Sequence, residues 1–510
     1  MQCGIMEINM NFRMIRYITA QLLIVEGLFM TIPLAVTLIY REYAMLPSFL
    51  IPMGIMFLLG GVAIFFKPKN KTLGAKEGFI IVGLSWIIMS LFGCLPFVIS
   101  KLIPNFLDAY FETVSGFTTT GASVLTSADF DNLWNPLSPE LGMRGIFLWR
   151  SFTNWIGGMG VLVFILAIMP QQDMKSSRLM HVMRAEMPGP KVDKLVATVK
   201  RTAAIMYGIY IAMTLLQTIM LLLGGMDLYE ALTTSFSTAG TGGFAIWPDS
   251  MATFGGNVAH PEYCTWVITV FMLLFSINFN LYYLILTGKV LSALFSEELR
   301  WFLVMVLLSG TAIAVNIYEI SQTTAGCIRD AFFQVATVVS TTGFATADFN
   351  LWPGFSKTLL LILMFIGACA GSTGGGIKVG RIIIAVKGTL AEVKKMIHPR
   401  RVSSVRFENK TVDKDTINGS YAFLIMYAII FFLSFFLISL FDGRDFEVSF
   451  SAVAACINNI GPGFGEIGPT GNFALLSYAS KFVLTIDMLL GRLEIFPILL
   501  LFSVSVWRDK

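Results

Sequence analysis

Charged side chains are scarce in this sequence. Of its 510 residues, 36 are Lys or Arg and 32 are Asp or Glu, so that charged residues make up 13% of the chain. A soluble globular protein carries about 25% charged residues. So few charges cannot cover the surface of a soluble chain of this length, which excludes a cytosolic enzyme, a disordered protein and a nucleic-acid-binding domain. The apolar content of 55% instead indicates a membrane protein with several spans.

Sequence patterns typical of catalytic, metal-binding or nucleotide-binding sites are also missing. The six cysteines are far apart and form no CxxC pair, and none of the three histidines has a metal-ligand partner at a useful spacing. We find no pairing of a nucleophile with a base and no ATP-binding motif. The sequence therefore predicts a protein that is not an enzyme and that holds no cofactor.

Apolar runs long enough to cross a membrane recur along the whole sequence. A spanning helix needs about 20 mostly apolar residues. Ten such runs lie near residues 17–39, 48–66, 78–99, 145–168, 203–224, 265–287, 301–318, 357–386, 418–440 and 482–504. Four further apolar segments are too short to cross and are expected to be re-entrant helices. They lie near residues 108–119, 230–240, 330–341 and 447–459.

Basic residues are distributed unevenly between the two sides of these expected spans. If the N-terminus is inside, 27 of the 36 Lys and Arg residues fall in inner segments and seven in outer ones. Cytoplasmic loops of membrane proteins carry an excess of Lys and Arg, so the sequence predicts a cytoplasmic N-terminus. The re-entrant segments then open from the outer face. Segments 122–143 and 244–263 hold carboxylates but no Lys or Arg, which favours the entry of a cation there.

The four short segments are diverged copies of one unit. Each ends in a run rich in Thr, Gly or Asn, and the runs align on Gly121, Gly243, Gly343 and Gly461. An acidic residue stands thirteen positions earlier in three copies and fourteen in the last: Asp108, Glu230, Asp330 and Glu447. We expect this acid at the N-terminus of each short helix, where the helix dipole favours it. An ordinary turn or close-packing site would explain one such run, but not four in equivalent positions.

This repeat predicts an all-α polytopic membrane protein. Two leading spans are followed by four pseudo-symmetric units of helix, pore loop and helix around one ion pore. The expected boundaries are 1–76 for the leading spans, then 77–201, 202–300, 301–414 and 415–510 for the four repeats.

Backbone that lines such a pore can leave the helical pattern, and its carbonyl oxygens can replace the hydration shell of a monovalent cation. The candidate cation-binding residues are Thr119, Thr120, Gly121, Thr241, Gly242, Gly243, Thr341, Thr342, Gly343, Asn459, Ile460 and Gly461. The Gly242-Gly243 doublet leaves an uncertainty of one residue in the second copy, where Gly243 is preferred because Gly-Phe-Ala then matches the third copy. Since the four strands differ, we expect a short, asymmetric filter.

A second glycine cluster interrupts the expected span 357–386. Its residues are Gly371, Ser372, Thr373, Gly374, Gly375 and Gly376. So many small residues cannot form a straight lipid-facing helix, and no GKS or GKT follows them, which argues against a nucleotide-binding loop. We interpret the cluster as a flexible loop below the filter that can block or clear the pore. A glycine-rich helix contact is the alternative.

Two arginines fall inside expected spans. A charge within the membrane is costly and usually faces water or a partner. We interpret Arg492 as a pore-lining or gate-contacting cation, with an internal pair to Glu494 or Asp487 as the alternative. Arg150 lies close to the outer end of its span and is expected to be structural.

Six stretches resemble the Trk-type potassium uptake proteins, in the superfamily that also holds the Ktr and HKT transporters. They are residues 111–121, 155–160, 184–190, 371–376, 458–465 and 491–496. The two additional N-terminal spans resemble the Trk branch more than the Ktr branch. The resemblance implies potassium uptake across the bacterial inner membrane by a homodimer docked on a cytosolic nucleotide-binding regulatory ring. It also implies that loop 371–376 gates the pore, that Arg492 lies near this gate, and that each repeat has one filter glycine.

Two functional hypotheses remain at this point. The first is a gated, potassium-selective pore, and the second is a symporter that couples potassium to protons or sodium. Coupling would usually need a buried acid near the midplane, and Asp487 and Glu494 are the only candidates. A membrane enzyme lacks any catalytic constellation. A voltage-gated channel is disfavoured, because no span carries arginine at every third position.

Overall fold

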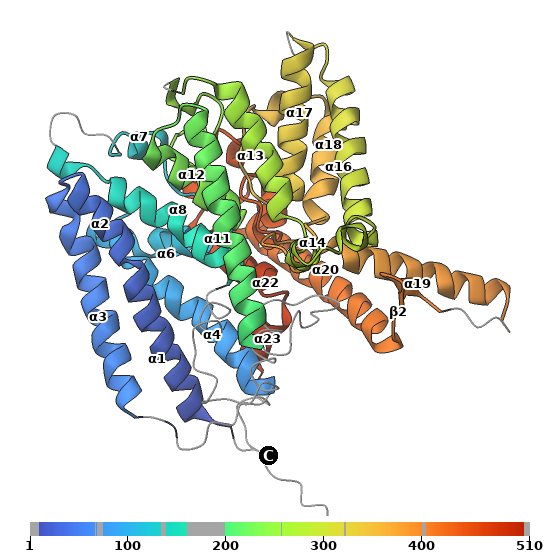
Figure 1. The fold of residues 1–510 in the computed structure, drawn as a ribbon, viewed down its shortest axis with the longest axis horizontal. Helices are drawn as coiled ribbons and strands as arrows, with labels where there is room; N and C mark the ends of the chain where they lie inside the picture. The colour runs from blue at the N-terminus through green and yellow to red at the C-terminus, as the bar shows by residue number, and fades with distance from the viewer. Residues whose placement is uncertain are drawn as a thin grey trace, which may run out of the picture.

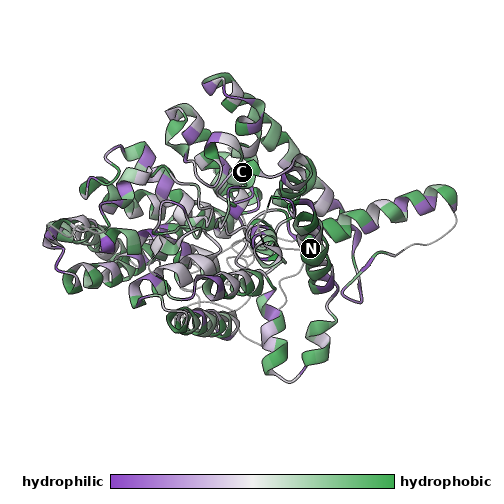
Figure 2. Cartoon of the chain, turned by 90° about the horizontal axis from the view of Figure 1, so that it is seen from above, coloured by the Kyte–Doolittle hydropathy of each residue, from purple (hydrophilic) through white to green (hydrophobic). Residues whose placement is uncertain are grey.

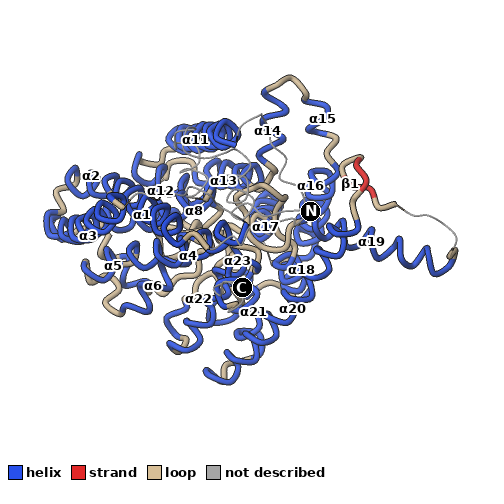
Figure 3. The backbone as a smooth tube through the Cα atoms, turned by 90° about the horizontal axis from the view of Figure 1, so that it is seen from below, coloured by secondary structure: helices blue, strands red, loops and turns tan. Residues whose placement is uncertain are grey.

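The computed structural model describes residues 10–66, 68, 75–133, 139–160, 199–256, 258–320, 323–399 and 404–503. Within these residues the protein is helical apart from loops and one two-stranded hairpin, in which β1 (Arg406–Phe407) pairs antiparallel with β2 (Lys410–Thr411) (Figure 3). The prediction of an all-α architecture is confirmed. Residues 161–168 of the expected fourth span and the stretch 184–190 lie outside the described residues.

Three helices precede the repeats and lie together at one side of the molecule (Figure 1). They are α1 (Phe12–Phe29), α2 (Thr31–Ile39) and α3 (Leu46–Phe65). Helix α1 packs against α3 and against α4 (Ala75–Gly93), the first helix of the first repeat. The leading helices therefore stand outside the repeats and contact them through the first one.

The four repeats share one order of elements. The first continues from α4 with α5 (Leu95–Ile99), α6 (Phe106–Phe117), α7 (Ser127–Phe130) and α8 (Arg144–Met159). The second holds α11 (Val199–Leu223), α12 (Leu228–Gly240), α13 (Pro261–Phe275), α14 (Phe279–Leu286) and α15 (Val290–Leu294). The third holds α16 (Glu297–Asn316), α17 (Thr324–Val339), α18 (Gly354–Phe365) and α19 (Val379–Ile397). The fourth holds α20 (Lys414–Asp442), α21 (Phe446–Ile457), α22 (Tyr478–Arg492) and α23 (Phe496–Phe502).

The repeats close into a ring. Within each repeat the short helix (α6, α12, α17 or α21) packs between the helix before it and the helix after it. Between repeats, α8 packs against α12, α13 against α17, α18 against α21, and α22 against α6. Because the fourth repeat returns to the first in the same way as the others follow one another, the helices surround a common axis.

The first helix of each repeat is continuous, whereas the second is short or broken. Among the described residues, six helical segments are long and apolar enough to span a membrane: Phe12–Ile39, Tyr43–Phe65, Lys76–Ile99, Arg201–Leu223, Glu297–Asn316 and Lys414–Asp442. The expected span 265–287 is instead the pair α13 and α14, bent by 92°. The expected span 357–386 ends at Phe365, and 482–504 breaks between α22 and α23, where Glu494 and Ile495 have φ of 52° and 72°.

Side-chain caps explain where three of the short helices begin. Asn105 accepts hydrogen bonds from the backbone of α6, and Asp227 forms a capping box with Glu230 on α12. Thr323 caps α17, which therefore starts earlier than its acidic residue requires. The expected acid lies in the first turn of the other three short helices, at Asp108, Glu230 and Glu447. For Asp330 the expectation was wrong, because α17 begins before it.

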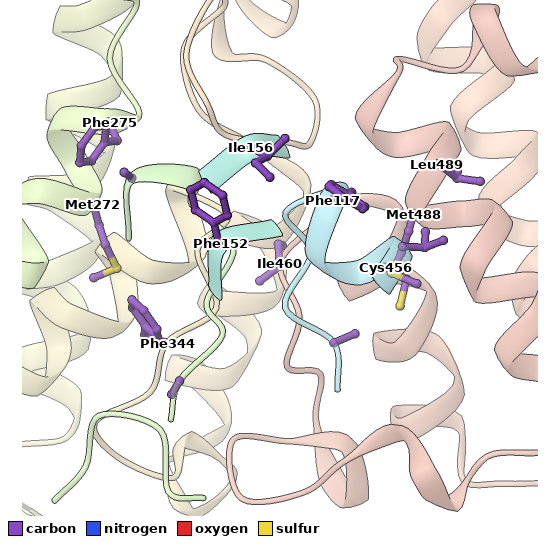
Figure 4. Packing of buried hydrophobic residues seen from close by; sticks show 14 of the residues in the cluster. Phe117, Phe152, Ile156, Met272, Phe275, Phe344, Cys456, Ile460, Met488 and Leu489 are labelled. Atoms are coloured by element: carbon purple, nitrogen blue, oxygen red, sulfur yellow. The ribbon is translucent and has the colours of Figure 1, made fainter. Parts of the chain in front are cut away.

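Apolar side chains fill the space behind the loops that follow the short helices. Figure 4 shows this packing for Phe117 of α6, Phe152 and Ile156 of α8, Met272 and Phe275 of α13, and Met488 of α22, all buried in one cluster. On the outside, hydrophobic residues run along the helices (Figure 2), and many are more than half exposed, as for Leu215, Leu307 and Phe432. Exposed apolar side chains over this area fit a surface that faces lipid.

Candidate functional site

The same unusual backbone geometry occurs after each short helix. We call residues 119–121, 241–243, 341–343 and 459–461 the glycine strands. The first residue of each has a left-handed φ: 56° at Thr119, 54° at Thr241, 57° at Thr341 and 55° at Asn459. The last has φ of 81° at Gly121, 67° at Gly243, 89° at Gly343 and 102° at Gly461. A left-handed non-glycine residue costs about 1–3 kcal/mol, so four equivalent ones indicate a geometry imposed by the surroundings. The pattern also makes Gly243, not Gly242, the counterpart of Gly121.

The four glycine strands form a closed ring of close backbone contacts. A Cβ atom at Gly121 would lie 2.4 Å from the carbonyl oxygen of Gly242, and one at Gly243 would lie 2.0 Å from that of Thr342. A Cβ at Gly343 would lie 2.0 Å from the carbonyl oxygen of Ile460. The ring closes at Gly461, where a Cβ would lie 2.7 Å from the carbonyl oxygen of Thr120. Each glycine thus admits the carbonyl group that precedes the glycine of the next repeat, and no side chain would fit between them.

Hydroxyl and amide side chains hold the glycine strands from behind. The Oγ atoms of Thr118 and Thr120 are 2.8 Å apart, and those of Ser340 and Thr342 are 2.6 Å apart. Asn459 Nδ2 donates to Thr120 Oγ1 at 3.0 Å and to the carbonyl oxygen of Met488 at 2.9 Å. The fourth strand is therefore tied to the first strand and to α22.

A cavity of about 90 Å³ opens on one side of the ring, and we call it the mouth cavity. Gly121, Gly243, Gly343 and Gly461 all line it, together with Arg150. On the other side lies a cavity of about 30 Å³, which we call the loop cavity. It has room for about two water molecules. The glycine strands therefore lie between a larger cavity and a smaller one.

Much of the wall of the loop cavity comes from residues 366–378, which we call the glycine loop. Its two ends meet at a bridge between Ile366 and Ile377, where Gly367 N donates to the carbonyl oxygen of Ile377 at 2.8 Å. Its tip reaches the glycine strands, because Gly375 N donates to Thr341 Oγ1 at 2.7 Å. A Cβ at Gly375 would lie 2.8 Å from the carbonyl oxygen of Asn458, so only glycine allows this approach.

Arg492, at the end of α22, holds the glycine loop against the first repeat. Its Nη1 donates to the carbonyl oxygen of Thr373 at 2.6 Å. Its Nη2 donates to the carbonyl oxygens of Gly157 and Gly158 at 2.6 Å each. The two acids that the sequence offered as its partners are bound to other residues. Glu494 pairs with Arg381, and Asp487 accepts a hydrogen bond from Ser434 at 2.7 Å.

The sequence did not reveal a second residue that holds the glycine loop, Glu298. This buried side chain at the start of α16 accepts hydrogen bonds through Oε1 from Ala370 N and Gly380 N, both at 2.9 Å. Glu408 of the β1–β2 hairpin accepts in turn from Glu298 N at 3.0 Å. An acid in the first turn after Ser296 indicates the start of a helix in the sequence. The sequence does not show its two partners, because each is more than seventy residues away.

These features define the class of protein. A closed ring of four helix–loop–helix repeats, with glycine strands between two cavities, is an architecture for moving an ion through a membrane. Among the residues that the structure describes, no cluster of three or more His, Cys, Asp or Glu side chains could hold a metal ion.

Comparisons with known proteins give the family. Residues 46–510 match the profile of the TrkH family, described as cation transport proteins. The chain is 34% identical to the Trk system potassium uptake protein TrkH of Salmonella typhimurium and 35% identical to that of Vibrio parahaemolyticus, in each case over 98% of this chain and the full length of the relative. The crystal structure of the potassium transporter TrkH from Vibrio parahaemolyticus aligns with a TM-score of 0.84 and 30% identity, covering 98% of this chain and 100% of that one. The chain belongs to the TrkH family, which confirms the predicted membrane fold and the prediction that it is a transporter and not an enzyme.

Proposed function

We propose that this protein takes up potassium across the bacterial cytoplasmic membrane through the ring of glycine strands. The closed ring of contacts from Gly121 to Gly461 carries this proposal, because all four repeats meet there backbone to backbone. Relatives that match over their full length are named as potassium uptake proteins, which supports potassium as the transported ion.

The cation would enter from the mouth cavity and lose its water at the glycine strands. Carbonyl oxygens can replace the hydration shell of a monovalent cation. The carbonyl groups that meet a neighbouring glycine belong to equivalent residues, namely Thr120, Gly242, Thr342 and Ile460. They support one well-formed site of the predicted short filter. The distribution of Lys and Arg supports an outward mouth cavity and a cytoplasmic N-terminus.

The glycine loop would act as the gate below this filter. It lines the loop cavity, whose volume is about 30 Å³, and it touches the strands of the third and fourth repeats through Gly374 and Gly375. Arg492 holds it by the carbonyl group of Thr373. Movement of residues 371–376 away from the strands would enlarge the path.

Partners would dock on the side of the protein from which α19 extends (Figures 1 and 3). This helix leaves the body of the molecule and carries an exposed apolar stripe: Val386 (52% exposed), Leu390 (53%), Val393 (46%) and Ile397 (65%). Such a stripe needs a partner or lipid. It supports the homodimer that the family resemblance implies. The lysines and arginines around it suit the expected cytosolic regulatory ring.

A potassium symporter coupled to protons or sodium is the second candidate. Glu494 lines the loop cavity, but it is already paired with Arg381, and Asp487 is not among the residues that line either cavity. The contacts of both acids therefore favour the pore.

Uptake of radioactive rubidium into proteoliposomes tests the choice. A pore predicts flux down the rubidium gradient alone, with no effect of an added proton or sodium gradient at constant membrane potential. Flux that requires the second gradient would support the symporter instead, and an absence of flux under every condition would contradict uptake altogether.

A further inference from the structure

Lys378 is a buried cation whose partners are carbonyl groups. It immediately precedes α19, is 6% exposed, and lines the loop cavity. Its Nζ donates to the carbonyl oxygen of Gly374 and to that of Gly375, the latter at 3.3 Å. Within the part of the chain that the structure describes, no carboxylate oxygen lies within 4 Å of this ammonium group.

Three consecutive carbonyl oxygens of the glycine loop are thus occupied by positive charge. Arg492 takes that of Thr373, and Lys378 takes those of Gly374 and Gly375. The last two belong to glycines that pack directly on the glycine strands, since a Cβ at Gly374 would lie 3.4 Å from Thr341 Oγ1 and one at Gly375 would lie 2.7 Å from the Cβ of Asn459. A charged side chain buried in such a place usually has a function that offsets its cost.

An ammonium group and a potassium ion are bound by the same kind of ligand, namely carbonyl oxygens. The lysine ammonium is a compact point charge without an acceptor, and carbonyl dipoles can coordinate either cation. We propose that the carbonyl oxygens of Gly374 and Gly375 form an inner site for a monovalent cation, and that the Lys378 ammonium occupies this site as a tethered ion while the glycine loop lies against the strands. This inference rests on the proposed pore and assigns to it a second ion site and an internal blocker.

The proposal differs from a plain structural brace in one respect. A brace requires the covalent link between the ammonium group and the backbone, because its effect comes from holding two segments together. A tethered ion acts through its charge at the site, so a free alkylammonium ion of similar size should replace it once the side chain has been shortened.

Rubidium flux into proteoliposomes made from the full-length protein tests this difference. We expect Lys378→Ala to raise the flux about tenfold, because a charged donor is removed from two carbonyl groups. Adding n-butylammonium on both sides should return that flux toward the wild-type value while leaving the wild type unchanged. Lys378→Arg should stay at the wild-type flux. Lys378→Met should show raised flux that n-butylammonium does not block, because its side chain still fills the space.

Lys289→Ala is the matched control, since Lys289 is an exposed lysine that lies outside α19 and lines neither cavity. It should show wild-type flux with or without n-butylammonium. Lys378→Ala flux equal to the wild type, or raised flux that n-butylammonium leaves unaltered, would overturn the tethered-ion proposal while wild-type flux still supports the pore. If Lys378→Ala does not fold, Lys378→Ser takes its place in the same test: raised flux that n-butylammonium lowers supports the proposal, and raised flux that it leaves unaltered, or unchanged flux, contradicts it. A wild type without rubidium flux would contradict the proposed function itself.

Discussion

Glu112 and Arg150 form a buried ion pair beside the mouth cavity. Arg150 Nε lies 2.7 Å from Glu112 Oε1, and the two side chains are 4% and 0% exposed. Glu112 also accepts from Val124 N at 2.8 Å, while Arg150 Nη1 donates to the carbonyl oxygen of Ala245 at 2.8 Å. Val124 and Ala245 follow the first and second glycine strands. This one pair therefore holds the backbone just after two neighbouring glycine strands, which agrees with a structural role for Arg150.

Breaking this pair should destabilise the protein strongly. Arg150→Gln leaves the Glu112 carboxylate buried without its cation, which typically costs about 3–5 kcal/mol. Thermal unfolding of the purified protein in detergent measures the loss. Arg444→Gln is the control, because its pair with Glu466 is 34% and 50% exposed and should contribute only about 0–1 kcal/mol. Equal shifts of the unfolding temperature in the two variants would show that the buried pair contributes no more to stability than the exposed one.

A side chain at the third filter glycine should weaken the discrimination between potassium and sodium. In Gly343→Ser the new Cβ would lie 2.0 Å from the carbonyl oxygen of Ile460, and φ is already 89° there. The strand must shift, which moves the carbonyl groups that we assign to the ion. Competition of sodium with rubidium uptake in proteoliposomes measures the effect, and we expect sodium to compete about tenfold more strongly.

Gly354→Ser provides the control for this substitution. A Cβ at Gly354 would meet no atom within 4 Å, so its selectivity should match the wild type. Unaltered selectivity in Gly343→Ser as well would remove Gly343 from the filter.

Deleting residues 372–376 should raise the flux through the resting protein. The bridge between Ile366 and Ile377 lies outside the deletion, so the neck of the glycine loop can still form. The deletion removes the tip that contacts Thr341 and the carbonyl group that Arg492 binds. Rubidium uptake without any added partner or nucleotide measures resting flux. A deletion variant that folds but remains closed would show that the loop does not block the path.

The repeat pattern was visible in the sequence because it depends on local rules. The spacing of an acid and a glycine around Gly121, Gly243 and Gly343 located the short helices to within a few residues, apart from the early start of α17. Apolar length alone could not show which spans break. The run 482–504 reads as one helix, yet Glu494 and Ile495 adopt left-handed angles that no residue preference predicts.

Contacts between distant segments could not be predicted from a single chain. Glycines 374–376 indicated a loop in the sequence. The contact of Gly375 with Thr341 was not predictable, because it depends on how the third repeat folds back on its own glycine strand. The pair of Arg381 with Glu494 joins residues 113 positions apart. The sequence left Glu494 as a possible partner of Arg492, because charge and proximity along one helix were the only guides.

Loosening the ends of the glycine loop should open the path without touching the ion. Glu298 binds Ala370 N and Gly380 N through one carboxylate oxygen, so Glu298→Ala frees both ends of the loop at once. We expect resting rubidium flux to rise severalfold, with a smaller rise in Glu298→Gln, which keeps an acceptor oxygen. The control is Glu392→Gln, since the pair of Glu392 with Lys395 is 65% and 58% exposed on α19. Because the carbonyl groups of the glycine strands are unaltered, competition by sodium should stay at the wild-type level in both Glu298 variants. A loss of selectivity there would mean that Glu298 supports the strands themselves, and an unchanged flux would mean that the loop is held closed without it.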